Sequence, residues 1–340
     1  MTGKVLSFGE LLLRICPDMK GSWLEQNQLP FYVGGAEANV ATALALWGVP
    51  SAYFTALPDN LMAHQLVSYL KSKQINTDRI TFQGDRIGLY YLPKGSDLKN
   101  AGVIYDRSNS SFSNLKPGTI NWDEVFEGVS WLHFSAICPA LNQQVANVCL
   151  EAVKAAKAKN ITISLDLNYR AKLWQYGKKP TEIVPELAQY CTLIMGNLWA
   201  ANTMLGITLQ ENIFANDNKE AYLEHAELTS KAIMNVFPNC KAVANTFRFD
   251  KYKGIKYYTT LYTNNRLLVS QEHSTDLIID KVGSGDCFMA GLIYGFYNEL
   301  PPAETLEFAT AAAYKKLFIL SDATSSTVEE VNQLIVQYAK

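Results

Sequence analysis

Short apolar runs alternate with helix-like stretches along most of the chain. The apolar runs lie at residues 5–8, 52–55, 131–134, 162–165, 192–195 and 241–244. Stretches with the periodicity of helices lie at residues 40–47, 65–73, 144–159 and 223–236. Nearly continuous apolar strands that alternate with helices indicate a mostly parallel central sheet, covered by helices on both faces. The predicted fold class is therefore α/β.

Two regions interrupt this alternation. Residues 11–16 with 31–33, and residues 89–92 with 103–107, have the pattern of short strands joined by turns without a helix between them. The simplest account is one domain over residues 1–340 with a small β-sheet lid, formed by about residues 11–34 and 87–110. Such a sheet could cover a ligand at the carboxyl edge of the main sheet, or it could be an ordinary sheet extension.

Composition excludes several classes of protein. Of the 340 residues, 48% are hydrophobic and 18% are charged, which is typical of a sizeable core rather than of disorder. The 30 basic and 32 acidic residues are evenly mixed and give a formal net charge of -2, so no basic face is expected for nucleic acid. The six cysteines and four histidines are scattered without metal-ligand spacing, which predicts buried thiols in a reducing compartment.

The chain is expected to be a soluble cytoplasmic protein. Glu10 interrupts the first apolar run, so no signal peptide is predicted. Residues 38–58 carry no charge and are about as long as a membrane span, but Gly48-Val49-Pro50 lies in their middle. This stretch is better explained by a short helix, a turn and a buried strand.

The strongest chemical signal lies at residues 277–291. An apolar run enters the turn Gly283-Ser284-Gly285-Asp286, and an apolar helix is predicted from Cys287 onward. Glycines and a helix start let main-chain amides converge on one point, which makes an anion site. Asp286 could accept a proton from an attacking hydroxyl beside that site, or it could cap the helix. The third glycine of a dinucleotide fingerprint is missing, and no P-loop motif occurs.

A second signal opens the first long helix. Gly34 and Gly35 precede that helix and permit close approach of the backbone to a ligand, and the amide of Asn39 can bind hydroxyl groups. Taken alone, paired glycines before a helix usually mark only a turn.

Together the two motifs resemble the signatures of the ribokinase-like (PfkB) family of carbohydrate kinases. They are Gly34-Gly35-x-x-x-Asn39 near the start and Asp280-x-Val282-Gly283-x-Gly285-Asp286 near the end, and the similarity spans essentially the whole chain. The resemblance implies a ribokinase-like fold, ATP and Mg²⁺ as cofactors, and a homodimer formed through the lid. It also allows a monovalent cation such as K⁺ near Asp280. The implied roles are Asp286 as catalytic base, the backbone of Gly283, Ser284 and Gly285 as anion hole, and Asn197, Asn245, Gly283 and Gly285 as nucleotide contacts.

Within the family, residues 9–14, 103–107 and 166–170 resemble those of 2-keto-3-deoxygluconate kinases. A sugar acid carries a carboxylate, which guanidinium groups bind in a bidentate manner and tyrosine hydroxyls can orient. Each arginine could instead form a salt bridge. The implied substrate contacts are Gly34, Gly35, Asn39, Tyr90, Tyr105, Arg107 and Arg170.

Two departures from the family limit these expectations. Ala200 replaces the glutamate of the metal-linked Asn-x-x-Glu pattern that starts at Asn197, and residues 243–248 replace the usual glycine turn near the nucleotide. The metal ligands and the residues that hold adenine are therefore not predicted. A fructokinase, another neutral-sugar kinase and a non-catalytic sugar or nucleotide sensor stay open as alternatives.

Overall fold

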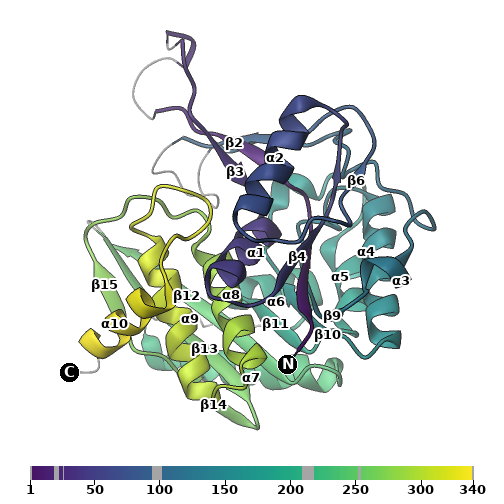
Figure 1. Ribbon diagram of the computed structural model, residues 1–340. Helices are drawn as coiled ribbons and strands as arrows, with labels where there is room; N and C mark the ends of the chain where they lie inside the picture. The colour runs from purple at the N-terminus through teal and green to yellow at the C-terminus, as the bar shows by residue number, and fades with distance from the viewer. Residues whose placement is uncertain are drawn as a thin grey trace.

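A central sheet organises the protein, whose computed structural model describes residues 2–18, 23–25, 27–93, 102–208, 218–251 and 254–338. Within these residues the sheet has nine strands in the order β14-β13-β12-β11-β10-β9-β1-β4, and β15 pairs with β13 (Figure 1). The strands from β12 to β4 are parallel, and β13, β14 and β15 are antiparallel. Their bounds are β1 Lys4–Phe8, β4 Ser51–Phe54, β9 Val129–Ser135, β10 Thr162–Asp166, β11 Leu193–Gly196, β12 Ala242–Lys251, β13 Gly254–Thr263, β14 Arg266–Val269 and β15 His273–Thr275.

Helices cover both faces of this sheet, as predicted. Along β1 and its neighbour β9, Val5 and Trp131 face one helical layer while Leu6 and Leu132 face the other. The first layer contains α1 (Ala36–Leu46), α8 (Ser284–Tyr297), α9 (Pro302–Lys316) and α10 (Val328–Tyr338). The second contains α3 (Trp122–Val125), α4 (Gln143–Ala158), α5 (Pro180–Ala188) and α6 (Leu198–Leu205), and α7 (Lys219–Val236) packs beside it against β12 and β13 (Figure 1).

Asparagine caps set where several helices begin. The side chains of Asn60, Asn142 and Asn218 accept hydrogen bonds from the first turns of α2 (Leu61–Ser72), α4 and α7. These helices therefore start one to four residues before the positions predicted from periodicity. The uncharged stretch at residues 38–58 contains most of α1, a turn at Gly48 with φ of 79° and β4, as predicted. None of the described helices is both long enough and apolar enough to cross a membrane.

A separate small sheet has the strand order β3-β2-β7-β8. Its strands β2 and β7 pair in parallel and join two distant segments of the chain, as the sequence predicts for the lid. Residues 19–22, 26 and 94–101 of the predicted lid lie outside the described residues. The bounds are β2 Leu12–Ile15, β3 Phe31–Gly34, β7 Gly88–Tyr91 and β8 Ile104–Asp106, and β5 (Ala56–Leu57) and β6 (Thr81–Phe82) form a further parallel pair.

Helices α8 and α9 approach each other closely along their length. A side chain at Gly291 of α8 would collide with the backbone of Ala309 in α9, and one at Gly295 would lie 2.5 Å from atoms of Thr305. The two glycines therefore permit the packing that orients α8, whose first turn carries Asp286.

This packing predicts that Gly291→Ala destabilises the fold. We expect the free energy of unfolding to fall by about 1–3 kcal/mol, because overpacking outweighs the better helix propensity of alanine. Denaturant unfolding followed by circular dichroism measures the change. Gly102→Ala is the matched control, because a side chain there would meet open space. Equal stability of the two variants would contradict the packing argument.

Candidate active site

A cavity of about 660 Å³ lies at the carboxyl ends of the parallel strands. The N-terminal ends of α1 and α8 and the inner face of the small sheet complete its wall. This is the edge where parallel α/β sheets bind ligands. The predicted site residues that line it are Gly35, Asn39, Tyr90, Tyr105, Arg107, Arg170, Asn197, Gly283, Ser284, Gly285 and Asp286.

The glycine turn forms the first turn of α8. Gly283 is the N-cap with a left-handed φ of 77°, and the helix begins at Ser284, three residues earlier than predicted. Since the carbonyl of Asp322 packs against Gly283, no side chain fits there. The first-turn amides of Ser284, Gly285 and Asp286 have no acceptor within the helix, so they can bind an anion.

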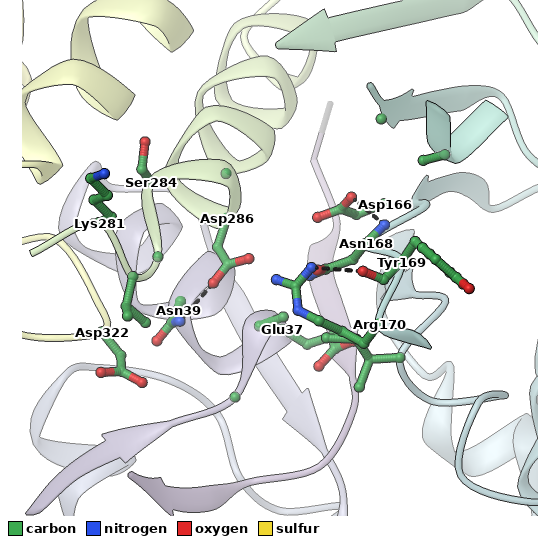
Figure 2. Close-up of a pocket in the computed structure, with 18 of the residues that line it drawn as sticks. Glu37, Asn39, Asp166, Asn168, Tyr169, Arg170, Lys281, Ser284, Asp286 and Asp322 are labelled. Atoms are coloured by element: carbon green, nitrogen blue, oxygen red, sulfur yellow. Dashed lines mark hydrogen bonds between the residues drawn. The ribbon is translucent and has the colours of Figure 1, made fainter. Parts of the chain in front are cut away.

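Asp286 lies between this turn and α1. Its Oδ2 accepts a hydrogen bond of 2.7 Å from Asn39 Nδ2, which joins the early motif to the late one (Figure 2). Since Gly283 is the N-cap and makes no side-chain bond, the prediction that Asp286 might cap the helix is wrong. Burial raises the pKa of Asp286 to about 6, although the bond from Asn39 opposes the rise. A carboxylate with this pKa is suited to accept a proton near neutral pH.

Asp166 is a second carboxyl group in the cavity, which the predicted set omitted. It ends β10, and its Oδ1 accepts a 3.0 Å bond from the amide of Asn168. Burial, and then the charge of Asp286, raises its pKa to about 8, so Asp166 is mostly protonated at neutral pH. Figure 2 shows both carboxyl groups directed toward the same space. The two environments leave Asp286 as the ionised partner. One signal in the sequence could have identified Asp166: its carboxyl group comes directly after a predicted buried strand.

The side chain of Glu37 attaches the start of α1 to the central sheet. Its Oε1 accepts bonds from the amide (3.0 Å) and hydroxyl (2.5 Å) of Ser135, and burial raises its pKa. A side chain at Gly9 would collide with its carboxyl group. The helix that carries Asn39 is thus fixed to the end of β9. This role cannot be read from the sequence, because it depends on a strand almost a hundred residues away.

Arg107 lies in the cavity wall but already has an acidic partner. Its Nε donates to Glu10 Oε2 at 2.5 Å, and both side chains are buried. Burial lowers the pKa of Arg107, but the charge and the hydrogen bond of Glu10, together with smaller effects of Cys138 and Glu37, make the net change a rise. Gly88 lacks a side chain where Glu10 needs space.

Arg170 extends into the cavity from the loop after β10. Its Nη1 donates to the carbonyl of Tyr169 at 2.9 Å, and Figure 2 shows the guanidinium between Asp166 and Asp286. A hydrogen bond with Arg170 and its charge oppose the rise that burial causes in the pKa of Tyr105. Within the part of the chain that the structure describes, no acidic side chain forms an ion pair with Arg170.

Tyr90 and Gly34 contact Asp322 at the base of the small sheet. The Tyr90 hydroxyl donates to Asp322 Oδ2 at 2.5 Å, and its ring lies 6.4 Å from that of Tyr105. A side chain at Gly34 would lie 2.8 Å from the same oxygen, so Gly34 is required for this packing. Gly34 itself is not part of the cavity wall, unlike Gly35.

Of the two asparagines predicted to contact the nucleotide, one lies in the cavity wall and the other does not. Asn197 caps α6 by accepting from the amide of Ala200 at 2.8 Å, and it lines the cavity. Asn245 is buried outside the wall, where its amide donates to the carbonyl of Gly196 at 3.0 Å, so the structure gives it a role in the sheet instead. The wall at this end contains residues that the sequence analysis did not predict: Trp199, Thr246, Arg248 and Tyr257.

The oxygen donors in the wall suit magnesium. Asp286 and the amide of Asn197 offer carboxylate and carbonyl oxygens, and Asp166 would join them only after losing its proton. The described residues contain no group of three acidic, histidine or cysteine side chains that could hold a metal alone. This donor set fits an ion that keeps most of its waters and binds mainly to nucleotide phosphates.

Comparisons with known proteins also indicate a carbohydrate kinase. The sequence profile described as "pfkB family carbohydrate kinase" matches residues 2–237. A 2-dehydro-3-deoxygalactonokinase of Haloferax volcanii is 24% identical over 98% of this chain and 97% of its own. Probable fructokinase-3 of Arabidopsis thaliana is 27% identical over 86% of this chain and 77% of its own. The crystal structure of 2-dehydro-3-deoxygluconokinase from Thermotoga maritima has a TM-score of 0.88 at 31% identity, covering 98% of this chain and 99% of that one.

The raised pKa of Asp286 predicts how phosphoryl transfer depends on pH. Only the carboxylate accepts a proton, so kcat/KM should fall tenfold per pH unit below about pH 6 and stay level above it. Asp286→Asn should lower kcat by about 10²–10⁴-fold while the fold is retained. Initial rates across pH 4.5–8.5 measure both effects. The exposed Asp276→Asn is the control, and near-normal turnover of Asp286→Asn would exclude Asp286 as the base.

Proposed function

Because the chain belongs to the pfkB family of carbohydrate kinases and transfers a phosphoryl group to a sugar, we propose that its substrate is a 2-keto-3-deoxy sugar acid, with 2-keto-3-deoxygluconate as the first candidate. One observation carries this proposal. Arg170 presents a guanidinium group to the cavity opposite the base, and it pairs with no acidic side chain among the described residues. A substrate carboxylate would be its partner.

Arg170 is a better candidate for this contact than Arg107. The guanidinium of Arg107 is neutralised by Glu10 within a buried pair. Replacement of Arg107 by alanine would leave a buried charge without its partner and cost about 3–5 kcal/mol of stability. An effect of that variant on sugar affinity would therefore mix binding with unfolding. Arg170 is half-buried and forms no ion pair with an acidic side chain among the described residues, although its charge lowers the pKa of the buried Asp286 and Asp166.

The residues of the site then take the following roles. Asn39 and the inner tyrosines, Tyr90 and Tyr105, contact the sugar, and Asp286 takes the proton of the attacking hydroxyl. The amides at the start of α8 bind the phosphoryl group as its charge develops. ATP is the phosphoryl donor of this family, and Mg²⁺ bound with it supplies charge neutralisation on the phosphates.

Some relatives support a second candidate. Proteins named as fructokinases cover most of the chain at 23–27% identity, and fructose has no carboxylate. A panel of 2-keto-3-deoxygluconate, 2-keto-3-deoxygalactonate, fructose and ribose, assayed by ADP release, separates the two. A clear preference for a neutral sugar would reject the sugar-acid proposal and leave the kinase activity standing.

Arg170→Met predicts a selective loss of affinity. We expect KM for the sugar acid to rise about 10- to 150-fold, which corresponds to a charge-assisted hydrogen bond of about 1.5–3 kcal/mol. KM for fructose should change less than about threefold. Arg79→Met is the matched control, because Arg79 pairs with Glu124 and Glu127 at the surface. Equal losses for the acid and the neutral sugar would contradict the assigned contact.

We propose that the chain forms a homodimer through the outer face of the small sheet. One residue from each of its four strands lies in a row on this face: Phe31, Ile15, Tyr91 and Ile104. Phe31 and Ile104 keep 53% and 52% of their surfaces exposed in the single chain. A second copy of this sheet could cover the row.

All six cysteines are buried free thiols, which fits the reducing cytoplasm as the proposed location.

The apolar row predicts the effect of Ile104→Glu on assembly. A charge in the middle of the contact should shift the protein to the monomer, because its burial would be unfavourable. Sedimentation velocity at micromolar concentration measures the state. Leu61→Glu is the control, since Leu61 is 76% exposed at the start of α2. A dimer that survives the Ile104 change would place the interface elsewhere.

A further inference from the structure

A buried cluster of four charges lies directly behind the anion-binding turn. It consists of Arg14, Asp280, Lys316 and Asp322, each at most 1% exposed, and we call it the charge cluster. Arg14 Nη2 contacts Asp280 Oδ2 at 2.6 Å, and Arg14 Nε contacts Asp322 Oδ1 at 3.1 Å. Two cations and two carboxylates balance to zero net charge.

Helix α9 holds the anion-binding turn at both ends. The amides of Ile279 and Asp280 donate to the carbonyl of Leu317 at 2.9 and 3.1 Å, just before the turn. The hydroxyl of Ser284 donates to the carbonyl of Ala313 at 3.2 Å, just after Gly283. The position of the turn therefore depends on the last turn of α9 and the residue that follows it.

Lys316 ends that helix, and its side chain runs underneath the turn. Its Cε lies 3.4 Å from where a side chain of Gly283 would begin, and its Nζ donates to the carbonyl of Ile319 at 3.0 Å. Burial lowers the pKa of Lys316, while the charges of Asp280 and Asp322 oppose this. The ammonium also compensates the negative C-terminal end of α9. Its charge reaches Asp286 and lowers the pKa of that carboxyl group against the effect of burial.

The oxygens near Asp280 do not fit a monovalent cation. Asp280 Oδ1 accepts from the amide of Val282 at 3.0 Å, and Oδ2 is taken by Arg14. Asp322 contacts Arg14 and the hydroxyl of Tyr90. An added cation here would meet two fixed positive groups, and both carboxylates already contact Arg14, so this cluster of side chains does not suit K⁺.

We propose that Lys316 is a positioning residue for phosphoryl transfer: its buried ammonium supplies, from inside the protein, the positive charge behind the turn of Gly283–Asp286, and turnover needs no added monovalent cation. Without Lys316 the charge cluster would carry a net negative charge close to the phosphoryl group. That charge would repel the anion and loosen the turn. The inference holds for whichever sugar the enzyme accepts, so it does not depend on the proposed sugar acid.

The first test uses the wild-type enzyme. Its kcat is measured with the best sugar of the panel in K⁺, Na⁺ and tetramethylammonium chloride at constant ionic strength and saturating MgATP. We expect the three values to agree within about twofold. Activation by K⁺ of tenfold or more over both other salts would overturn the inference. This outcome is independent of which sugar is turned over.

The second test compares Lys316→Met with Lys315→Met, which removes a lysine outside the cluster from the same helix end. Lys316→Met should lower kcat about tenfold or more, because a charge near the reacting phosphate is lost, and leave KM for the sugar within about threefold. Lys315→Met should be unchanged. Thermal melts establish that both variants are folded, and wild-type kcat in a folded Lys316→Met would overturn the inference.

Chemical rescue separates charge from packing. Lys316→Ala leaves space where the side chain lay, and methylammonium or K⁺ should restore at least a tenth of the lost kcat if the missing charge is the cause. Methanol and tetramethylammonium should not restore it. Equal recovery with methanol would show a packing role and overturn the proposal. Should neither Lys316 variant fold, the salt series on the wild-type enzyme decides alone.

Discussion

The hydrogen bond between Asn39 and Asp286 brings the two ends of the chain into one site. Each residue lies in the first turn of a helix, and both helices start at the carboxyl edge of the parallel sheet. The bond fixes the direction of the Asp286 carboxyl group, the proposed base, while burial raises its pKa to about 6. The amides beside it lie at the positive end of α8, so the proposed proton acceptor and the proposed anion site lie within one helical turn.

Much of this arrangement could be predicted from the sequence because it rests on local rules. Apolar runs and helical periodicity identified the six parallel strands of the main sheet but not the antiparallel strands β13, β14 and β15, and glycine before a helix identified both motifs. The start of α8 was misplaced by three residues because Gly283 itself serves as the cap in a left-handed conformation. The periodicity of apolar residues does not depend on the φ angle of a single residue, so it could not indicate this cap.

The partners of buried charges could not be predicted, because pairing is decided by the fold. Arg14 and Asp280 are separated by 266 positions, and Glu10 meets Arg107 across 97. For Arg107 the sequence left both a substrate carboxylate and a salt bridge open, and only the fold identifies Glu10 as its partner. In the same way, Asn245 carries a residue type suited to nucleotide binding, yet its amide is used between two strands of the sheet.

The attachment of the small sheet to the charge cluster has a consequence for how sugar reaches the base. Arg14 on β2 and Tyr90 on β7 both contact Asp322, so the inner end of this sheet is anchored to the catalytic turn. Rotation of the whole sheet as a rigid body would break buried ion pairs at a cost of about 3–5 kcal/mol. At that cost, less than about one molecule in a hundred would be in the open state at any moment. Any movement of the small sheet should therefore be largest at its outer strand ends, where Phe31 on β3 and Ile104 on β8 are exposed, and smallest beside Asp322.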